Sequence, residues 1–358
     1  MSDVIVGGGG VIGLTIAWEL ASAGLKVCVL EQSQFGREAS WAGAGMIPPG
    51  DLLHPATHQL AVLSTQLWPE ISAVLRQQTG LSNGYRRCGG LLLEDRRSVP
   101  EIAAAWQERH IFAEVLDTRR IQEREPAFSA ATETAVWLPD MAQVRNPRHM
   151  KALQAACIQL GVELRPEEKV VRWERGRNNT IAAIVTERNR FSAAEYVVAA
   201  GAWSARLLAL LNIHLPIEPV HGQMLLFHAE APLFQHVIEQ GSRYLVPRDD
   251  GRILVGATEE RIGFEKRNTS ETTTQLREFA ISRIPALTNV PLEQQWSGFR
   301  PGCDLGHPVL GRSAEIDNLL IAAGHFRAGL SNSPGTALLM RQLILGEPTT
   351  IDLAGFQS

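Results

Sequence analysis

The N-terminal part of the chain changes its hydrophobic periodicity twice. Residues 4–6 are a short run of β-branched apolar residues, which predicts a buried parallel strand. Residues 11–25 then place apolar side chains at helical spacing, with Gly24 positioned to end a helix, and residues 26–32 return to a strand pattern. A strand, a helix and a second strand within about 30 residues have the length of a βαβ unit.

The rest of the chain alternates between helical and β-rich patterns. Helical spacing predicts helices over residues 59–78, 99–109, 272–284 and 335–346, and a helix followed by a strand over 147–165. Extended patterns predict a hairpin over 86–98 and a small antiparallel sheet over 169–204, with its turn at 177–179 and a return to a buried strand at 196–201. They also predict β-rich stretches over 217–255 and 292–312.

This order of elements predicts a discontinuous two-domain α/β fold, α+β overall. The opening βαβ unit belongs with pieces from the middle and the end of the chain, and the β-rich segments form a second domain threaded through the first. We assign residues 1–48, 145–214 and 298–358 to a Rossmann-type dinucleotide-binding domain. Residues 49–144 and 215–297 would form a substrate-binding domain around an antiparallel sheet.

Composition indicates which classes of partner and which cellular compartment to expect. The 358 residues carry a net charge of −4 and no basic run, so we expect no nucleic-acid partner. No stretch reaches about 18 apolar residues and no signal peptide precedes the first strand, so we expect a cytoplasmic protein without a membrane segment. Cys28, Cys88, Cys157 and Cys303 follow neither a CxxC nor a zinc-site spacing, which predicts free thiols, a reducing compartment and no metal.

Four consecutive glycines, Gly7 to Gly10, join the first strand to the helix. A G-x-G-x-x-G frame that begins at Gly7 lacks its third glycine, whereas the frame of Gly8, Gly10 and Gly13 is complete. In that frame Gly8 permits the tight turn, Gly10 the approach of a pyrophosphate, and Gly13 close packing of helix on strand, while Gly7 and Gly9 receive no role. The helix N-terminus adds free N–H groups and a positive dipole end for the phosphates.

Glu31 ends the second strand, 18 residues after Gly13, where a carboxylate accepts hydrogen bonds from ribose hydroxyls and disfavours a 2′-phosphate. The motif alone does not separate FAD from NAD. After Glu31 the chain breaks into the Gly- and Ala-rich stretch 37–46 and returns to the first domain only near Val170, Val197 and Ile321. This interrupted order is similar to the FAD-binding fold of the glutathione-reductase type.

Seven segments carry a specific family resemblance over nearly the whole chain. They are residues 4–24, SWAGAGMIPP (40–49), YVVAAGAWS (196–204), PVHGQM (219–224), YLVPRDDGRILVGATEE (244–260), GFRPGCDLGHPVLGR (298–312) and LLIAAGHFRAGL (319–330). In this order the chain resembles the D-amino-acid oxidase family, and within it most closely the glycine oxidases of thiamine-thiazole biosynthesis.

The resemblance implies an FAD-dependent amino-acid oxidase. It would deaminate glycine, or small amines such as sarcosine and D-alanine, by hydride transfer from Cα to flavin N5, giving glyoxylate, ammonia and H2O2 with O2 as acceptor. Some relatives attach the flavin through a cysteine whose position falls at Gly298, so Cys303 does not match it and we predict non-covalent FAD. The family also implies a homo-oligomer, a dimer or a tetramer.

The resemblance further implies which residues contact FAD. Glu31 and Gln32 would meet the adenosine ribose, and the backbone of Val170 the adenine. The other implied contacts lie at the helix N-terminus (Gly8, Gly10, Val11, Ile12, Gly13), in the following loop (Ser40, Gly43, Ala44, Gly45, Met46), at the end of the third strand (Gly201, Trp203) and in the late turn (Gly324, His325, Phe326, Arg327, Ala328, Gly329, Leu330).

The substrate carboxylate is the natural handle for orienting an amino acid, and an arginine fork suits it better than a lysine. The resemblance makes Arg300 the carboxylate clamp, Tyr244 a second carboxylate contact through its hydroxyl, and Arg327 a second pocket arginine. Structural ion pairs for the arginines and a core position for Tyr244 are the alternatives. No residue is assigned as a certain catalytic group, because the flavin is the oxidant and the protein positions the partners.

Several positions depart from the family pattern or carry no assigned role. Ala328 stands where the family usually has Asn, and residues 331–337 (SNSPGTA) are more polar than usual. We expect Glu259 and Glu260 to be solvated, although they begin the family's pocket wall, and His221 to be structural. Three alternative functions stay open: a D-amino-acid dehydrogenase that passes electrons to a quinone or a protein, a sarcosine-type oxidase, and a flavin-binding subunit without activity.

Overall fold

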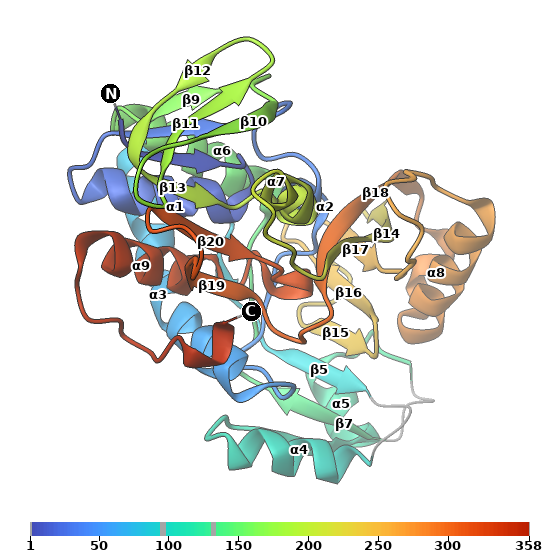
Figure 1. The fold of residues 1–358 in the computed structure, drawn as a ribbon. Helices are drawn as coiled ribbons and strands as arrows, with labels where there is room; N and C mark the ends of the chain where they lie inside the picture. The colour runs from blue at the N-terminus through green and yellow to red at the C-terminus, as the bar shows by residue number, and fades with distance from the viewer. Residues whose placement is uncertain (1, 94–97, 130–133, 358) are drawn as a thin grey trace.

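The computed structural model describes residues 2–93, 98–129 and 134–357 (Figure 1). The predicted βαβ unit is present as β1 (Ser2–Gly7), α1 (Val11–Ser22) and β2 (Val27–Leu30). Gly24 follows the end of α1 with a left-handed φ of 90°, as a residue that ends a helix often does. The mixed α/β fold class predicted from the sequence is confirmed.

A six-stranded sheet carries this unit. Its order is β19-β20-β13-β1-β2-β9, and its strands are parallel except for β19 at one edge. The further strands are β9 (Glu163–Arg165), β13 (Ala193–Val198), β19 (Val309–Arg312) and β20 (Leu319–Ala323). Burial on both faces explains why β1 and β2 read as continuous apolar runs rather than alternating ones.

Two layers cover the six-stranded sheet. On one face Val4 and Val6 pack with helices α1, α3 (Pro55–Thr79), α6 (Asn146–Gln159) and α9 (Ser333–Leu345). On the other face Ile5 packs against a small antiparallel sheet of β10 (Val170–Arg175), β11 (Ile181–Thr186) and β12 (Arg190–Phe191). The connection between β10 and β11 contains the predicted turn at 177–179. Helix α7 (Ser204–Ala209) follows β13.

The second main sheet has eight strands in the order β18-β14-β17-β16-β15-β5-β7-β6, and it runs down the right and lower part of Figure 1. All neighbouring pairs are antiparallel except β15 and β5. Its strands are β5 (Gly90–Leu93), β6 (Glu114–Asp117), β7 (Thr134–Leu138), β14 (Ile217–His228), β15 (Val237–Gln240), β16 (Arg243–Pro247), β17 (Arg252–Gly256) and β18 (Leu292–Cys303).

Helices cover both faces of the eight-stranded sheet. Helix α8 (Ser270–Arg283) buries Leu276 and Phe279 on one face, and α4 (Val99–Glu108) buries Ile102 on the other. Each helix begins where its sequence supplies a cap: Ser98 and Glu101 form a capping box for α4, and the Thr269 hydroxyl accepts from the backbone of α8. Helix α5 (Thr118–Arg124) follows β6, and short 3-10 turns lie at Pro285–Asn289 and Ala354–Phe356.

The predicted hairpin over 86–98 is wrong. Strand β4 (Arg86–Arg87) pairs with β8 (Ala142–Gln143), which also pairs with β3 (Met46–Ile47), whereas β5 belongs to the eight-stranded sheet. Residues 94–97 of that segment lie outside the described residues. The two strands are split because Gly89, with a left-handed φ of 71°, turns the chain from one sheet into the other.

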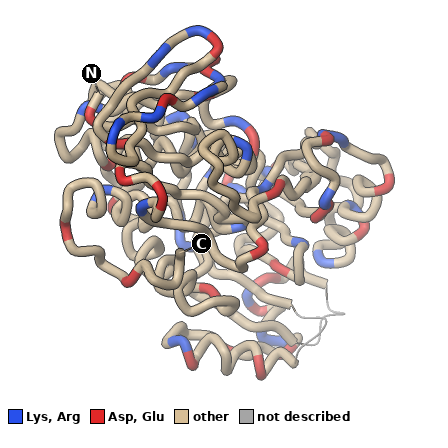
Figure 2. Tube along the Cα trace, in the orientation of Figure 1, with Lys and Arg blue, Asp and Glu red and all other residues tan. Residues whose placement is uncertain are grey.

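The predicted domain limits stay a prediction. Helix α3 belongs to the segment assigned to the second domain, yet its Leu60 and Leu75 pack in the core of the six-stranded sheet. Strand β18 runs across the limit at 297/298. Acidic and basic residues are interspersed along the traced chain (Figure 2). Within the described residues, no helix combines the length and the apolar character needed to cross a membrane.

Candidate active site

A cavity of about 970 Å³ lies between the two main sheets and is lined from both of them. This size is at the upper end for ligand pockets. Residues from β1, the start of α1 and the end of β2 line one part, and residues from β14, β16 and β18 line another. Every residue predicted from the sequence to contact FAD or substrate lines this cavity except Gly13. The contacts themselves stay predictions.

The turn from β1 into α1 is shaped by glycines at one end of the cavity. Gly8 has φ of 126°, and a β-carbon there would lie 2.3 Å from the carbonyl oxygen of Ala199. A β-carbon on Gly13 would lie 1.9 Å from the carbonyl oxygen of Gly8, so Gly13 allows the helix to pack on the turn rather than lining the cavity. Gly10 is the N-cap of α1 and has no side chain to cap it. The backbone N–H of Val11 donates to Ser40 Oγ at 2.8 Å.

Gly9, which received no role from the sequence, is constrained as tightly. A β-carbon on Gly9 would lie 2.4 Å from the ring of Phe35. Its N–H donates to Glu31 Oε2 at 2.9 Å, and the N–H of Ser33 donates to Glu31 Oε1 at 2.9 Å. Two backbone amides therefore fix the carboxylate of Glu31 at the edge of the cavity, where its remaining lone pairs can accept from ribose hydroxyls.

The loop around helix α2 (Ala39–Ala42) is held by two side chains that sequence reasoning missed. Asn146 Nδ2 donates to the carbonyl oxygen of Ser40 at 3.0 Å. Arg248 is buried and donates to the carbonyl oxygen of Ala44 at 2.6 Å and to Gln143 Oε1 at 2.5 Å. Burial lowers the pKa of Arg248 to about 10, which leaves it charged at neutral pH. Arg248 lies in one of the segments that resemble the family (244–260), but no spacing in the sequence indicates that it contacts Ala44 and Gln143.

The late turn brings a buried histidine to the cavity. His325 precedes a 3-10 turn (Phe326–Ala328), and its Nε2 lies 3.0 Å from Thr336 Oγ1 near the start of α9. Burial lowers the pKa of His325 to about 3, so the ring is neutral at physiological pH. Trp68 of α3 donates its indole N–H to the carbonyl oxygen of Ser331 at 2.8 Å. The polar segment that departs from the family pattern is thus tied to α3.

Arg300 and Tyr244 lie in the part of the cavity formed by the eight-stranded sheet. The guanidinium of Arg300 crosses Gly222, where a β-carbon would lie 2.3 Å from Nη1. Arg300 Nη1 donates to the carbonyl oxygen of Thr258 at 3.0 Å. Tyr244 is buried and its hydroxyl donates to Met224 Sδ at 3.2 Å. Burial raises the pKa of Tyr244 more than the neighbouring Arg300 lowers it, so the phenol stays a neutral donor.

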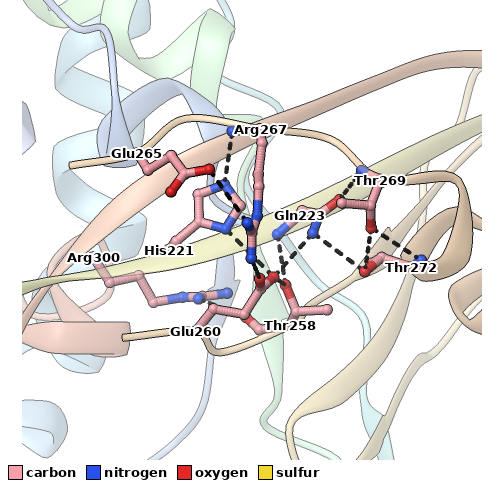
Figure 3. A network of polar contacts seen from close by, with 9 residues as sticks. All are labelled: His221, Gln223, Thr258, Glu260, Glu265, Arg267, Thr269, Thr272 and Arg300. Atoms are coloured by element: carbon pink, nitrogen blue, oxygen red, sulfur yellow. Dashed lines mark hydrogen bonds and ion pairs between the residues drawn. The ribbon is translucent and has the colours of Figure 1, made fainter. Parts of the chain in front are cut away.

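A polar network supports Arg300 from the side of Thr258 (Figure 3). Glu260 Oε1 accepts from Gln223 Nε2 at 2.9 Å and from Thr258 Oγ1 at 3.0 Å, and His221 Nδ1 lies 3.4 Å from the same oxygen. The expectation that Glu260 is solvated is therefore wrong: its side chain is 24% exposed and holds this network together. Burial alone would raise the pKa of Glu260, but the hydrogen bonds lower it by more. The pKa therefore lies below its ordinary value, and the carboxylate is charged. His221 is fully buried and lies outside the lining of the cavity, and its structural role stays a prediction.

Arg327 lines the cavity but is already paired. Its Nε lies 2.5 Å from Glu259 Oε1, and the two side chains are 44% and 31% exposed. Glu259 is thus partly open to solvent, as expected. Its ion pair with Arg327 was not predicted from the sequence. Arg327 therefore forms a structural ion pair and also lines the pocket, so both interpretations of this residue agree with the structure.

A family model described as FAD dependent oxidoreductase (DAO) matches residues 3–343. The chain belongs to this family. The prediction of a flavoenzyme of the D-amino-acid oxidase family is confirmed, and FAD is its cofactor. Among curated members of the DAO family, a glycine oxidase of Pseudomonas aeruginosa is 36% identical, over 99% of this chain and 97% of the relative. The bifunctional protein ThiO/ThiG of Synechocystis is 36% identical over 97% of this chain and 52% of its own length.

Solved structures of the DAO family agree with the sequence relatives. The crystal structure of glycine oxidase from Geobacillus kaustophilus has a TM-score of 0.95 and 31% identity, and covers 99% of this chain and 98% of its own. The structure of iminodiacetate oxidase from Chelativorans has a TM-score of 0.89 and 27% identity, with 99% and 98% covered.

The residues around the cavity fit FAD. The turn at Gly8 and Gly10, the glycine N-cap of α1, put backbone rather than side chains on the wall of the cavity, as the close approach of a pyrophosphate requires. The four cysteines lie in the described part of the chain and outside the lining of the cavity. Burial raises the pKa of all four thiols, to about 12 for Cys28 and Cys157. Among the described residues, no group of three or more His, Cys, Asp or Glu side chains could hold a metal ion.

Proposed function

We propose that this protein oxidises glycine, and small amines such as sarcosine or D-alanine, with FAD as cofactor and O2 as electron acceptor. The overall reaction would be glycine + O2 + H2O → glyoxylate + NH3 + H2O2. The observation that carries the proposal is the presence of Arg300 and the neutral hydroxyl of Tyr244 in the same cavity as the dinucleotide turn. An amino-acid oxidase needs a carboxylate-binding pair within reach of its cofactor, so the shared cavity supports the proposal.

The side chains of this cavity would bind and orient the substrate. Arg300 would offer a planar fork to the carboxylate while the carbonyl oxygen of Thr258 accepts from its Nη1. Tyr244 adds a hydroxyl donor, since its contact with a thioether sulfur is weak and is readily exchanged for a carboxylate. When bound, FAD supplies a two-electron acceptor for the Cα–H bond. The protein's contribution would be orientation and exclusion of water.

A role in thiamine-thiazole biosynthesis is part of the same proposal. It is supported by the similarity to glycine oxidases and to the bifunctional protein ThiO/ThiG, of which the chain covers 52%. A cytoplasmic location and a homo-oligomeric state stay predictions.

Peroxide release from the FAD-loaded protein with glycine, sarcosine and D-alanine tests the proposal. We expect peroxide with at least glycine, in the presence of O2. Turnover with an artificial acceptor and none with O2 would instead favour a dehydrogenase, and a strong preference for sarcosine a sarcosine-type oxidase. Bound FAD with no turnover of any of these amines by either acceptor would sink the proposal and favour an inactive flavin-binding subunit.

Non-covalent attachment of FAD has its own test. Because no thiol lines the cavity, acid precipitation of the protein should release the yellow colour into the supernatant. A yellow pellet would contradict this prediction.

A further inference from the structure

A second cavity adjoins the first at Arg327. It also has a volume of about 970 Å³, and Ser242 and Arg327 line both cavities. Residues of the β15–β16 connection and of α8 form most of its wall: Gln240, Gly241, Arg243, Gln275, Glu278, Phe279, Ser282 and Arg283. Glu259 lines the second cavity only, so the ion pair of Arg327 and Glu259 stands at the boundary between the two.

This boundary decides what charge the first cavity offers to a substrate. Arg300 and Arg327 both line that cavity, and each guanidinium could bind a carboxylate. Arg300 hydrogen-bonds a neutral carbonyl and keeps its positive charge for a ligand. Arg327 instead has its charge balanced by Glu259 at 2.5 Å, and Glu239 lines the cavity as a further negative charge.

We infer that Glu259 is a specificity-determining residue, which holds Arg327 and so restricts the substrate to amines that carry a single carboxylate. The inference rests on the proposed function and deepens it. A substrate with a second carboxylate, such as an N-carboxymethyl amino acid, would have to displace Glu259 and would meet its negative charge at the boundary. An uncharged substituent would meet no such repulsion and could extend toward the second cavity.

The same geometry predicts what removal of the carboxylate does. Glutamine at position 259 keeps the size of the side chain but no longer balances Arg327. Arg327 is then freed from Glu259, and the cavity offers two guanidinium groups to a dicarboxylate although Glu239 still lines it. Because the two side chains are 44% and 31% exposed, the fold depends little on the pair, and the variant should fold.

The test measures binding of acetate, malonate, succinate and glutarate to the FAD-loaded enzyme through the change in flavin absorbance, which requires no turnover. In E259Q we expect the affinity for at least one dicarboxylate, relative to acetate, to rise about tenfold or more, as charge-assisted hydrogen bonds predict. E278Q is the matched control, because Glu278 lines the second cavity from α8 and loses the same charge; its ratios should match those of the unaltered enzyme. Adding R327M to E259Q should abolish the gain.

Two outcomes would overturn the inference: unchanged dicarboxylate-to-acetate ratios in E259Q, or an equal rise in E278Q. Peroxide release is then compared for glycine and iminodiacetate, and the ratio of kcat/KM should shift toward iminodiacetate in E259Q. If no variant oxidises any amine while the binding ratios shift as expected, the proposed function fails and the role of Glu259 in charge selection stands. If glycine is oxidised and the ratios do not move, only the inference fails.

Discussion

The two ends of the main cavity are built by different means. The end at α1 is made of backbone groups. Its shape requires residues without a β-carbon at Gly8, Gly9 and Gly13. The end at the eight-stranded sheet is made of long side chains, such as Arg300 and Tyr244, which come from separate strands. A backbone site tolerates almost no added atom, whereas a side-chain site can change its specificity through one substitution.

The supports of the two ends differ in the same way. Arg248 holds the loop at the first end by donating to two backbone carbonyls, which any sequence would present, and also to the side-chain oxygen of Gln143. Glu260 holds the second end by accepting from the side chains of Gln223 and Thr258, which are specific to this sequence. The cofactor end is therefore suited to a constant ligand, and the substrate end to a ligand that varies between relatives.

The largest effect should come from adding one methyl group at the first end. In G13A the new carbon would lie 1.9 Å from the carbonyl oxygen of Gly8, so helix and turn must separate. Overpacking of this kind costs about 1–3 kcal/mol and occasionally more. We expect G13A to purify without yellow colour and with a lowered melting temperature.

Gly7 supplies the matched control within the same glycine run. A β-carbon there would lie 3.4 Å from its nearest neighbour, Leu207, which is ordinary contact, and Gly7 has no left-handed φ. G7A should keep FAD. Equal loss of FAD in G7A and G13A would show that the run is not read in the frame of Gly8, Gly10 and Gly13.

A smaller and more selective effect is expected at the second end. R300A removes a charge-assisted contact of about 1.5–3 kcal/mol, so KM for glycine should rise about tenfold or more while the flavin spectrum stays unchanged. R300K should recover only part of the loss, because an ammonium is a point charge rather than a fork. R188A, which removes an exposed ion pair with Glu167, should leave KM unchanged. Loss of FAD from R300A would contradict the separation of the two ends.

The sequence predicted the first end better than the second. The frame of Gly8, Gly10 and Gly13 and the carboxylate of Glu31 could be located because a βαβ unit is local, and its parts keep a fixed spacing. Gly9 was missed because its constraint is Phe35, and nothing in the spacing shows that this ring turns back onto the glycine run. The hairpin over 86–98 failed for a related reason: its two strands join different sheets, and pairing partners far along the chain leave no local trace.

At the second end, the family resemblance placed Arg300, Tyr244 and Arg327 in one cavity, and all three line it. It did not show which of them is already paired. The roles of Glu259 and Glu260 differ although they are adjacent, because Glu259 pairs with Arg327 whereas Glu260 accepts from Gln223 and Thr258. Glu259 reaches the boundary of the second cavity, and Glu260 reaches the network behind Arg300. Only the fold shows which of the two glutamates has which position.

The last prediction uses the buried His149 to test how acid affects α6, the helix whose Asn146 lines the main cavity. His149 of α6 is buried beside the ring of Trp68, with ring centroids 5.0 Å apart, and burial lowers its pKa to about 4. Like His325, His149 is a buried ring that is neutral at physiological pH, although His149 does not line the cavity. Each supports stability that is complete above the unfolded-state pKa near 6.5 and is lost as the pH falls toward the folded pKa, by about 1.4 kcal/mol per pH unit.

In H149Q the free energy of unfolding should depend less steeply on pH, because about one fewer proton is taken up on unfolding. The free energy of unfolding, measured in urea at a fixed excess of FAD, should fall less steeply between pH 6.5 and pH 4 than in the unaltered protein. The substitution also removes the ring contact with Trp68 and so costs stability at every pH, which is why the slope and not the absolute value decides. H214Q changes an exposed histidine and should keep the original slope. An unchanged slope in H149Q would show that the acid sensitivity of the cofactor end arises elsewhere, and it would leave His325, which lines the cavity itself, as the group to replace next.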